Sequence, residues 1–218
     1  MRNLLFVFLV LLAGATSAQQ KFNSVLKKQL DSVLVLDQKY RDTLTWLMTP
    51  GKSDSIPLLK SMSASKAMSH YWTLQNRADS ANVVFVEKLF KTYGYPGKTL
   101  VGEPANEAAW YVIQHSPKID QYLPMMKKAA ESKELPFRLY AMMLDRQLMN
   151  QHKEQIYGTQ ATSAALKNGE KIGWYIWPIQ NPAGVNERRK KAGFDQTVEE
   201  NAKRLGVDYK EIKIEDVK

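Results

Sequence analysis

Apolar residues recur every three to four positions over most of this chain, and prolines and glycines interrupt the repeat. This spacing is typical of amphipathic helices, which must cover their apolar sides with one another. The repeat predicts helices over residues 22–48, 66–93, 104–115, 117–132, 136–150 and 196–205. We therefore expect a mainly α-helical, single-domain chain with a bundle-like core of about five to six helices.

A β-hairpin is expected near the C-terminal end, over residues 157–166 and 171–179. The second of these runs, IGWYIWPI, is rich in aromatic and β-branched residues. The runs flank Lys167-Asn168-Gly169-Glu170, and Asn-Gly between such runs favours a tight hairpin turn. A basic segment then precedes the last helix, and the tail after Gly206 is either an edge strand or a frayed end.

The first 18 residues have the pattern of a secretory signal peptide. Arg2 precedes an apolar run from Leu4 to Ala13, and small residues lead to Ala18. The run is too short to span a bilayer comfortably, although an uncleaved anchor is the alternative. We expect cleavage after Ala18, one mature domain over 19–218 in the periplasm or medium, and no integral membrane contact.

The composition of the chain limits the catalytic groups, metal sites and partners that can be expected. The chain has no cysteine, which excludes thiol catalysis, disulfides and cysteine-ligated zinc. Its formal net charge of +9 favours anionic ligands or envelope polymers as partners, although scattered basic residues also serve solubility. Nucleic acid is not expected as a partner of an exported protein.

Several ionisable residues occupy positions in the apolar stripes where a core residue would pack. Helical projection places Asp37, Asp79, Asp145 and His115 at such positions on four different helices. An isolated buried carboxylate is costly unless it is paired, so the pattern predicts that these helices share a polar cavity. The alternative is a purely structural network, for which Asp37 and Arg41 have the spacing of a local ion pair.

Such a cavity suits acid–base chemistry. We expect His115 as the general base or acid, Asp145 as the carboxylate that orients it, and Arg146 and Asp79 beside them. Arginines could hold an anionic group, and the Tyr-Gly-Thr-Gln run could supply hydroxyl and amide groups. A divalent cation on Asp37, Asp79, Asp145 and His115 is an alternative, but no metal-binding motif supports it, so no cofactor is expected.

A series of short motifs resembles a bacterial family known only as a domain of unknown function. Gly-Tyr-Pro-Gly, Val-Gly before an Ala-rich helix, Gln-His, Asp-Arg, Gln-Ile-Tyr-Gly-Thr-Gln and Arg-Arg occur in that order, and the resemblance covers residues 37–195. It implies no activity. It implies that the family's pattern includes Asp37, Arg41, Asp79, Asn82, Gln114, His115, Asp145, Arg146, Tyr157, Gly158, Thr159, Gln160 and Arg189.

Three functions remain open on the sequence. The first is a hydrolase or lyase that acts on a small polar or envelope-derived substrate. The second is a non-catalytic binding protein for an anionic ligand or partner, and the third is a structural or interaction domain with a buried polar network. The expected ligand-binding residues are Asp37, Arg41, Asn82, Gln114, Tyr157, Thr159, Gln160, Arg188 and Arg189.

Overall fold

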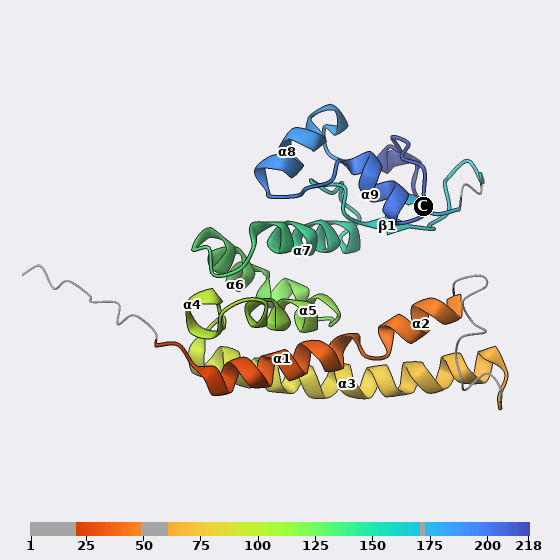
Figure 1. The fold of residues 1–218 in the computed structure, drawn as a ribbon. Coiled ribbons are helices and arrows are strands. Elements are labelled where there is room, and N and C mark those ends of the chain that lie inside the picture. Colours follow the sequence, from red (N-terminus) through yellow and green to blue (C-terminus); the bar gives the residue numbers. More distant parts are fainter. Residues whose placement is uncertain (1–20, 49–60, 171–172) are drawn as a thin grey trace, which may run out of the picture.

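The structure, a computed structural model, describes residues 21–48, 61–170 and 173–218. The expected signal peptide over 1–18 lies outside these residues. Figure 1 shows the helices arranged in tiers. The helices within residues 24–48 and 64–93 form the first tier, those within residues 98–131 form the second, and the helix of residues 137–150 separates them from the C-terminal part. The expected mainly helical fold with a small hairpin is confirmed.

The first tier contains α1 (Ser24–Gln38), α2 (Arg41–Met48) and α3 (Ala64–Tyr93). The single helix expected over 22–48 is divided at Lys39 and Tyr40, which form a turn. Leu26 and Leu30 of α1 are buried in one core cluster with residues from α3 and α4. The apolar repeat continues across the turn, and for that reason spacing alone does not reveal the break.

The middle of the molecule contains most of the apolar core. Its elements are α4 (Lys98–Val101), the 3₁₀ turn η3 (Ala105–Glu107), α5 (Ala108–Gln114), α6 (Ile119–Glu131) and α7 (Phe137–Asn150). Trp110, Ile113, Met126, Leu139 and Met143 are almost completely buried there. This packing fixes the C-terminal end of α5 and one side of α7, which both contribute to the candidate site.

The C-terminal part contains the hairpin and two short helices. Strands β1 (Ala161–Thr162) and β2 (Tyr175–Ile176) pair antiparallel, as expected, but they are shorter than the predicted runs. The basic segment forms an unexpected helix, α8 (Val185–Lys191), after the turn η4 (Pro182–Gly184). Helix α9 (Val198–Arg204) begins with a capping box, and the tail forms the turn η5 (Ile214–Asp216).

The tail returns to the hairpin, where Val217 forms an antiparallel bridge with Leu166. Both side chains are buried, together with Tyr175 and Trp177 of the second hairpin run. No helix among the described residues has the length and apolar character needed to cross a membrane.

Candidate functional site

The centre of the candidate site is a contact between His115 and Asp37. His115 follows the last residue of α5, and Asp37 lies in the last turn of α1. Nδ1 of the imidazole lies 2.9 Å from Oδ2 of the carboxylate, which also accepts a hydrogen bond of 2.6 Å from the side chain of Gln38. The side chain of Asp37 is 1% exposed and that of His115 is 23% exposed, so the contact joins a buried carboxylate to a ring that reaches solvent.

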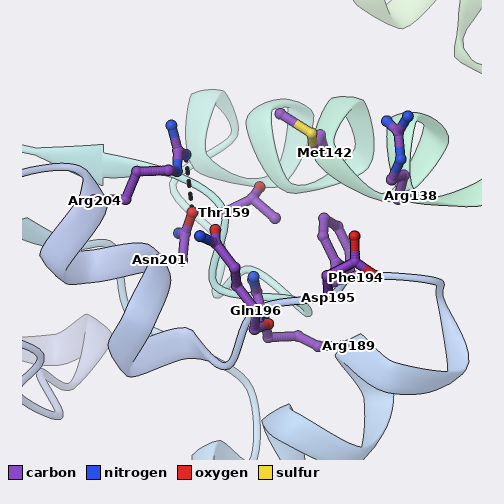
Figure 2. Close-up of a pocket in the computed structure, with 9 residues that line it drawn as sticks. All are labelled: Arg138, Met142, Thr159, Arg189, Phe194, Asp195, Gln196, Asn201 and Arg204. Atoms are coloured by element: carbon purple, nitrogen blue, oxygen red, sulfur yellow. Dashed lines mark hydrogen bonds between the residues drawn. The ribbon is translucent and has the colours of Figure 1, made fainter.

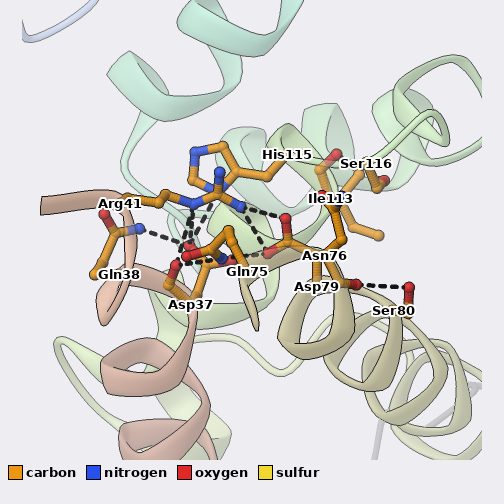
Figure 3. Close-up of polar contacts among 10 residues, drawn as sticks. All are labelled: Asp37, Gln38, Arg41, Gln75, Asn76, Asp79, Ser80, Ile113, His115 and Ser116. Atoms are coloured by element: carbon orange, nitrogen blue, oxygen red, sulfur yellow. Dashed lines mark hydrogen bonds and ion pairs between the residues drawn. The ribbon is translucent and has the colours of Figure 1, made fainter. Parts of the chain in front are cut away.

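Arg41 connects this pair to α3. Its Nη2 donates to both carboxylate oxygens of Asp79, at 2.6 and 2.7 Å, and its Nε donates to the backbone oxygen of Asp37. Gln75, one turn before Asp79, donates to the same backbone oxygen and to Asp79 Oδ1. Figure 3 shows these side chains pointing toward one another from α1, α2, α3 and the end of α5.

This network is neither sealed nor fully paired. The side chains of Arg41 and Asp79 are 20% and 21% exposed, which places them at the surface. In the described part of the chain, Asp37 Oδ1 and Gln75 Oε1 are buried and have no hydrogen-bond partner. Because a purely structural network should be sealed from solvent, the exposure of Arg41 and Asp79 is the feature of this arrangement that favours a site.

Arg146 of α7 lies near the same cluster. Its pKa is lowered because it is partly buried and because the charge of Arg41 is close. Its Nε is buried without a hydrogen-bond partner, and it forms no ion pair within the described residues. A guanidinium group that is desolvated and lacks a carboxylate partner suits an anionic group of a ligand.

The expected contact between His115 and Asp145 is not formed in the structure. Asp145 is completely buried, and it accepts hydrogen bonds from the backbone N–H groups of Ile156, Tyr157 and Thr159 and from the Thr159 hydroxyl. Burial raises its pKa, and these donors oppose that rise. Asp145 therefore holds the loop after α7, and Asp37 takes the orienting position beside His115.

The Tyr-Gly-Thr-Gln run and the two arginines of α8 form hydrogen bonds that hold the same loop in place. The side chain of Gln160 donates to Met142 and Thr159, and its backbone N–H donates to Gln155. Arg188 donates to the backbone oxygens of Ile156, Gln180 and Asn181. Arg189 donates to the backbone oxygens of Tyr157 and Gln196.

The expected site residues thus divide into two groups on different sides of α7. Asp37, Arg41, Asp79, His115 and Arg146 form one group, which we call the inter-helix site. The residues around the C-terminal loop are Asp145, Tyr157, Thr159, Gln160, Arg188 and Arg189. The expected residues Asn82 and Gln114 are buried on α3 and α5, and Asn82 Nδ2 and Gln114 Oε1 have no hydrogen-bond partner among the described residues.

Gln75 has a larger part in the site than the sequence indicated. Its position four residues before Asp79 on the same stripe was the available signal. The alternative of a cation held by Asp37, Asp79, Asp145 and His115 is not assembled, because Asp145 faces the loop and Arg41 bridges the other two carboxylates. In the described ranges, no three His, Asp or Glu side chains gather as metal ligands.

Comparison with known proteins gives a family and no activity. No curated protein and no solved structure was found to match the chain. A model of a family of unknown function, DUF6624, matches residues 65–215, from the first turn of α3 into η5. Asp37 and Arg41 lie before the matched segment, and Asp79, His115 and Arg146 lie within it. The match covers well over half of the sequence, and the chain therefore belongs to the DUF6624 family of unknown function.

Proposed function

We propose that the protein is an enzyme that carries out acid–base chemistry on a small anionic substrate at the inter-helix site. The contact between His115 and Asp37 is the observation that carries this proposal. An ionised carboxylate only accepts hydrogen bonds, so the contact favours a proton on Nδ1 and leaves the lone pair of Nε2 as a base. Nε2 has no hydrogen-bond partner among the described residues, and the ring reaches solvent.

The substrate's anionic group is assigned to Arg146. Arg41 is already bound to Asp79 through two short hydrogen bonds, whereas Arg146 has no carboxylate partner in the described ranges. Guanidinium groups bind carboxylates and phosphates through paired hydrogen bonds. The site therefore fits a small polar molecule that carries a carboxylate or a phosphate.

Hydrolysis and elimination both suit this arrangement. In hydrolysis, Nε2 takes a proton from the attacking water; in elimination, it takes a proton from carbon next to an acidifying group. Either step makes the imidazole positively charged, and the buried carboxylate of Asp37 stabilises that charge. The leaving group then recovers the proton from the same nitrogen, so that the ring returns to its neutral form.

A substrate search with matched variants tests the proposal. Wild type, His115→Asn and the control His70→Asn, which changes an exposed histidine of α3, are each incubated with a mixture of envelope-derived carboxylates and phosphates. Mass spectrometry follows the loss of each compound. We expect one compound to be consumed by wild type and the control and at least about a hundredfold more slowly by His115→Asn. Equal consumption by all three proteins would exclude His115 as the base.

Non-catalytic anion binding is the second candidate, because the unpaired guanidinium of Arg146 supports it equally well. Calorimetric titration separates the two. Binding that Arg146→Gln weakens and His115→Asn leaves unchanged, with no turnover by wild type, would assign the site to binding alone. Loss of turnover in His115→Asn with preserved affinity supports the enzyme.

We further propose that the protein acts outside the cytoplasm, in the periplasm or medium. The support is the charged, apolar and small-residue pattern of residues 1–18. The test is the intact mass of the protein recovered from the cell envelope of a bacterial host. A mature chain that begins at Gln19 supports export, and an uncut chain in the cytoplasm contradicts it.

A further inference from the structure

A cavity lies on the side of α7 that faces the C-terminal part, away from the inter-helix site. It has a volume of about 390 Å³, which is within the usual range for small-molecule pockets. Figure 2 shows Met142 of α7 on one wall, Phe194 and Gln196 from the segment between α8 and α9, and Asn201 and Arg204 of α9. We call it the Arg189 pocket after its most buried charged residue.

Arg189 is held there by contacts that leave its charge without a direct counterion. It is only 2% exposed, and its Nε and Nη1 donate to the backbone oxygens of Gln196 and Tyr157 at 2.8 and 2.7 Å. The ring of Phe194 lies 4.5 Å from the guanidinium carbon. Among the described residues, Nη2 has no hydrogen-bond partner and no carboxylate contacts the group.

A second arginine adds positive charge to the same cavity. Arg204 is exposed at the rim, and its Nη2 donates to Asn201 Oδ1 at 2.9 Å. It forms no ion pair in the described part of the chain. Burial lowers the pKa of Arg189 and the charge of Arg204 lowers it further, whereas the charges of Asp145, Glu199 and Glu200 oppose the shift. Arg138 also lines the cavity, but its guanidinium group is bound to Glu107 at 3.2 Å, and the exposed Asp195 carries the opposing charge at the rim.

We propose that the Arg189 pocket binds a small organic anion whose carboxylate or phosphate contacts Arg189 and Arg204. A bound anion stabilises a buried guanidinium group that has no direct counterion and lies near a second arginine without an ion pair. Guanidinium N–H groups also match the two oxygens of a carboxylate or the oxygens of a phosphate. Phe194 and Met142 supply an apolar wall, so the pocket fits an anion that carries an aromatic or aliphatic group. This binding site is separate from the inter-helix site and does not depend on the proposed catalysis.

Calorimetric titration with benzoate and phenyl phosphate tests this site, and acetate and inorganic phosphate are the matched anions without a ring. We expect the ring-bearing anions to bind more tightly than their matched partners. Arg204→Gln should weaken binding by about tenfold or more, whereas Lys203→Gln, which removes the same charge from the neighbouring exposed position, should not. Equal weakening by the two variants, or no binding by wild type, would overturn the proposal.

The background variant Arg146→Gln separates the two sites. Binding of benzoate or phenyl phosphate must persist in it, and loss of binding would assign the anion to the inter-helix site and overturn the second one. A direct readout is the side-chain Nε–H signal of Arg189 in ¹⁵N NMR spectra. Because Nε belongs to the guanidinium group of a residue that lines the pocket, we expect its signal to shift on titration in both wild type and Arg146→Gln; an unmoved signal contradicts the proposal.

Discussion

His115 Nδ1 lies 2.9 Å from Asp37 Oδ2, although 78 residues separate the two positions in the chain. The contact joins the end of α5 to the last turn of α1, and so it forms only when these two helices pack together. It orients the imidazole and directs Nε2 away from the buried carboxylate. Helices α1 and α5 therefore jointly position the imidazole–carboxylate pair of Asp37 and His115.

Replacing Asp37 by Asn should move the imidazole proton. An amide N–H can donate to Nδ1, which would then be the unprotonated nitrogen, and the proton would reside on Nε2. Any turnover at the site should fall by about a hundredfold or more, because Nε2 would no longer accept a proton. The ¹⁵N chemical shifts of His115 report the tautomer directly. Asp42→Asn, on the exposed side of α2, is the matched control and should change neither quantity.

Replacing Asp145 by Ala should destabilise the fold without removing the inter-helix site. The change leaves the N–H groups of Ile156, Tyr157 and Thr159 without their common acceptor. We expect the free energy of unfolding to fall by about 3–5 kcal/mol, because each buried donor that is left without an acceptor costs about 1–3 kcal/mol. Urea denaturation measures the loss. Asp120→Ala, which removes one exposed hydrogen bond to Gln147, should have an effect below about 1 kcal/mol; similar losses for both would contradict the role of Asp145.

Gly158→Ala should be more harmful than Gly169→Ala. Both glycines have a positive φ, of +66° and +79°, so both substitutions introduce backbone strain of about 1–2 kcal/mol. A Cβ at Gly158 would also lie 2.6 Å from Val198 Cγ2 and 2.8 Å from Ile179 Cδ1, whereas Gly169 has no atom within 4 Å. Overpacking should add about 1–3 kcal/mol at Gly158 alone. Thermal unfolding of both variants gives the difference, and equal losses would show that the loop yields to the methyl group.

Glu87 should make the stability of the protein depend on pH in the acid range. Hydrogen bonds from Lys118 Nζ at 2.6 Å and Tyr122 Oη at 2.7 Å lower its pKa below the usual 4.5. A lowered carboxyl pKa contributes stability that is complete above pH 4.5 and is lost as the pH falls through the folded-state value. Glu87→Gln should therefore be less stable than wild type at neutral pH, and the difference should shrink on acidification.

The same contact predicts that the stability of the protein also depends on pH in the alkaline range. Burial and the hydrogen bond to Glu87 raise the pKa of Tyr122 to about 12. Its contribution is complete below the usual value of 10.0 and is lost as the pH rises through about 12. Urea denaturation of wild type and Tyr122→Phe across this range measures the effect. A constant difference between the two proteins from pH 10.0 to about 12 would contradict the assignment.

Helices α3 and α7 were predictable because a glycine or a proline marks one end of each. Gly94 follows the last residue of α3, Pro136 precedes the first residue of α7, and the apolar repeat within each helix is long enough to be unambiguous. The turn at Lys39 and Tyr40 was not predictable, because apolar spacing continues on both sides of it. Helix α8 was also missed, since its charged residues hide the short buried side formed by Val185 and Arg189.

The sequence predicted which residues are buried at the site, but it did not predict which of them contact each other. Projection identified Asp37 and Asp145 as buried positions, and both are almost completely buried. Which partner each one meets depends on the packing of helices that are far apart in the sequence and on loop N–H groups that carry no side-chain signal. For that reason Asp145 was expected beside His115, although it supports the loop.

Asp145 and Arg146 are consecutive residues of α7, but Asp145 binds the C-terminal loop and Arg146 lies near Arg41 of the inter-helix site. Their shared backbone makes α7 a common wall, so a displacement of the helix changes the surroundings of the inter-helix site and of the Arg189 pocket at once. Thermodynamic linkage then requires that any effect of binding at one site on the affinity of the other be reciprocal. An anion that binds in the Arg189 pocket and changes the anion affinity of the inter-helix site by some factor must have its own affinity changed by that same factor when the inter-helix site is occupied.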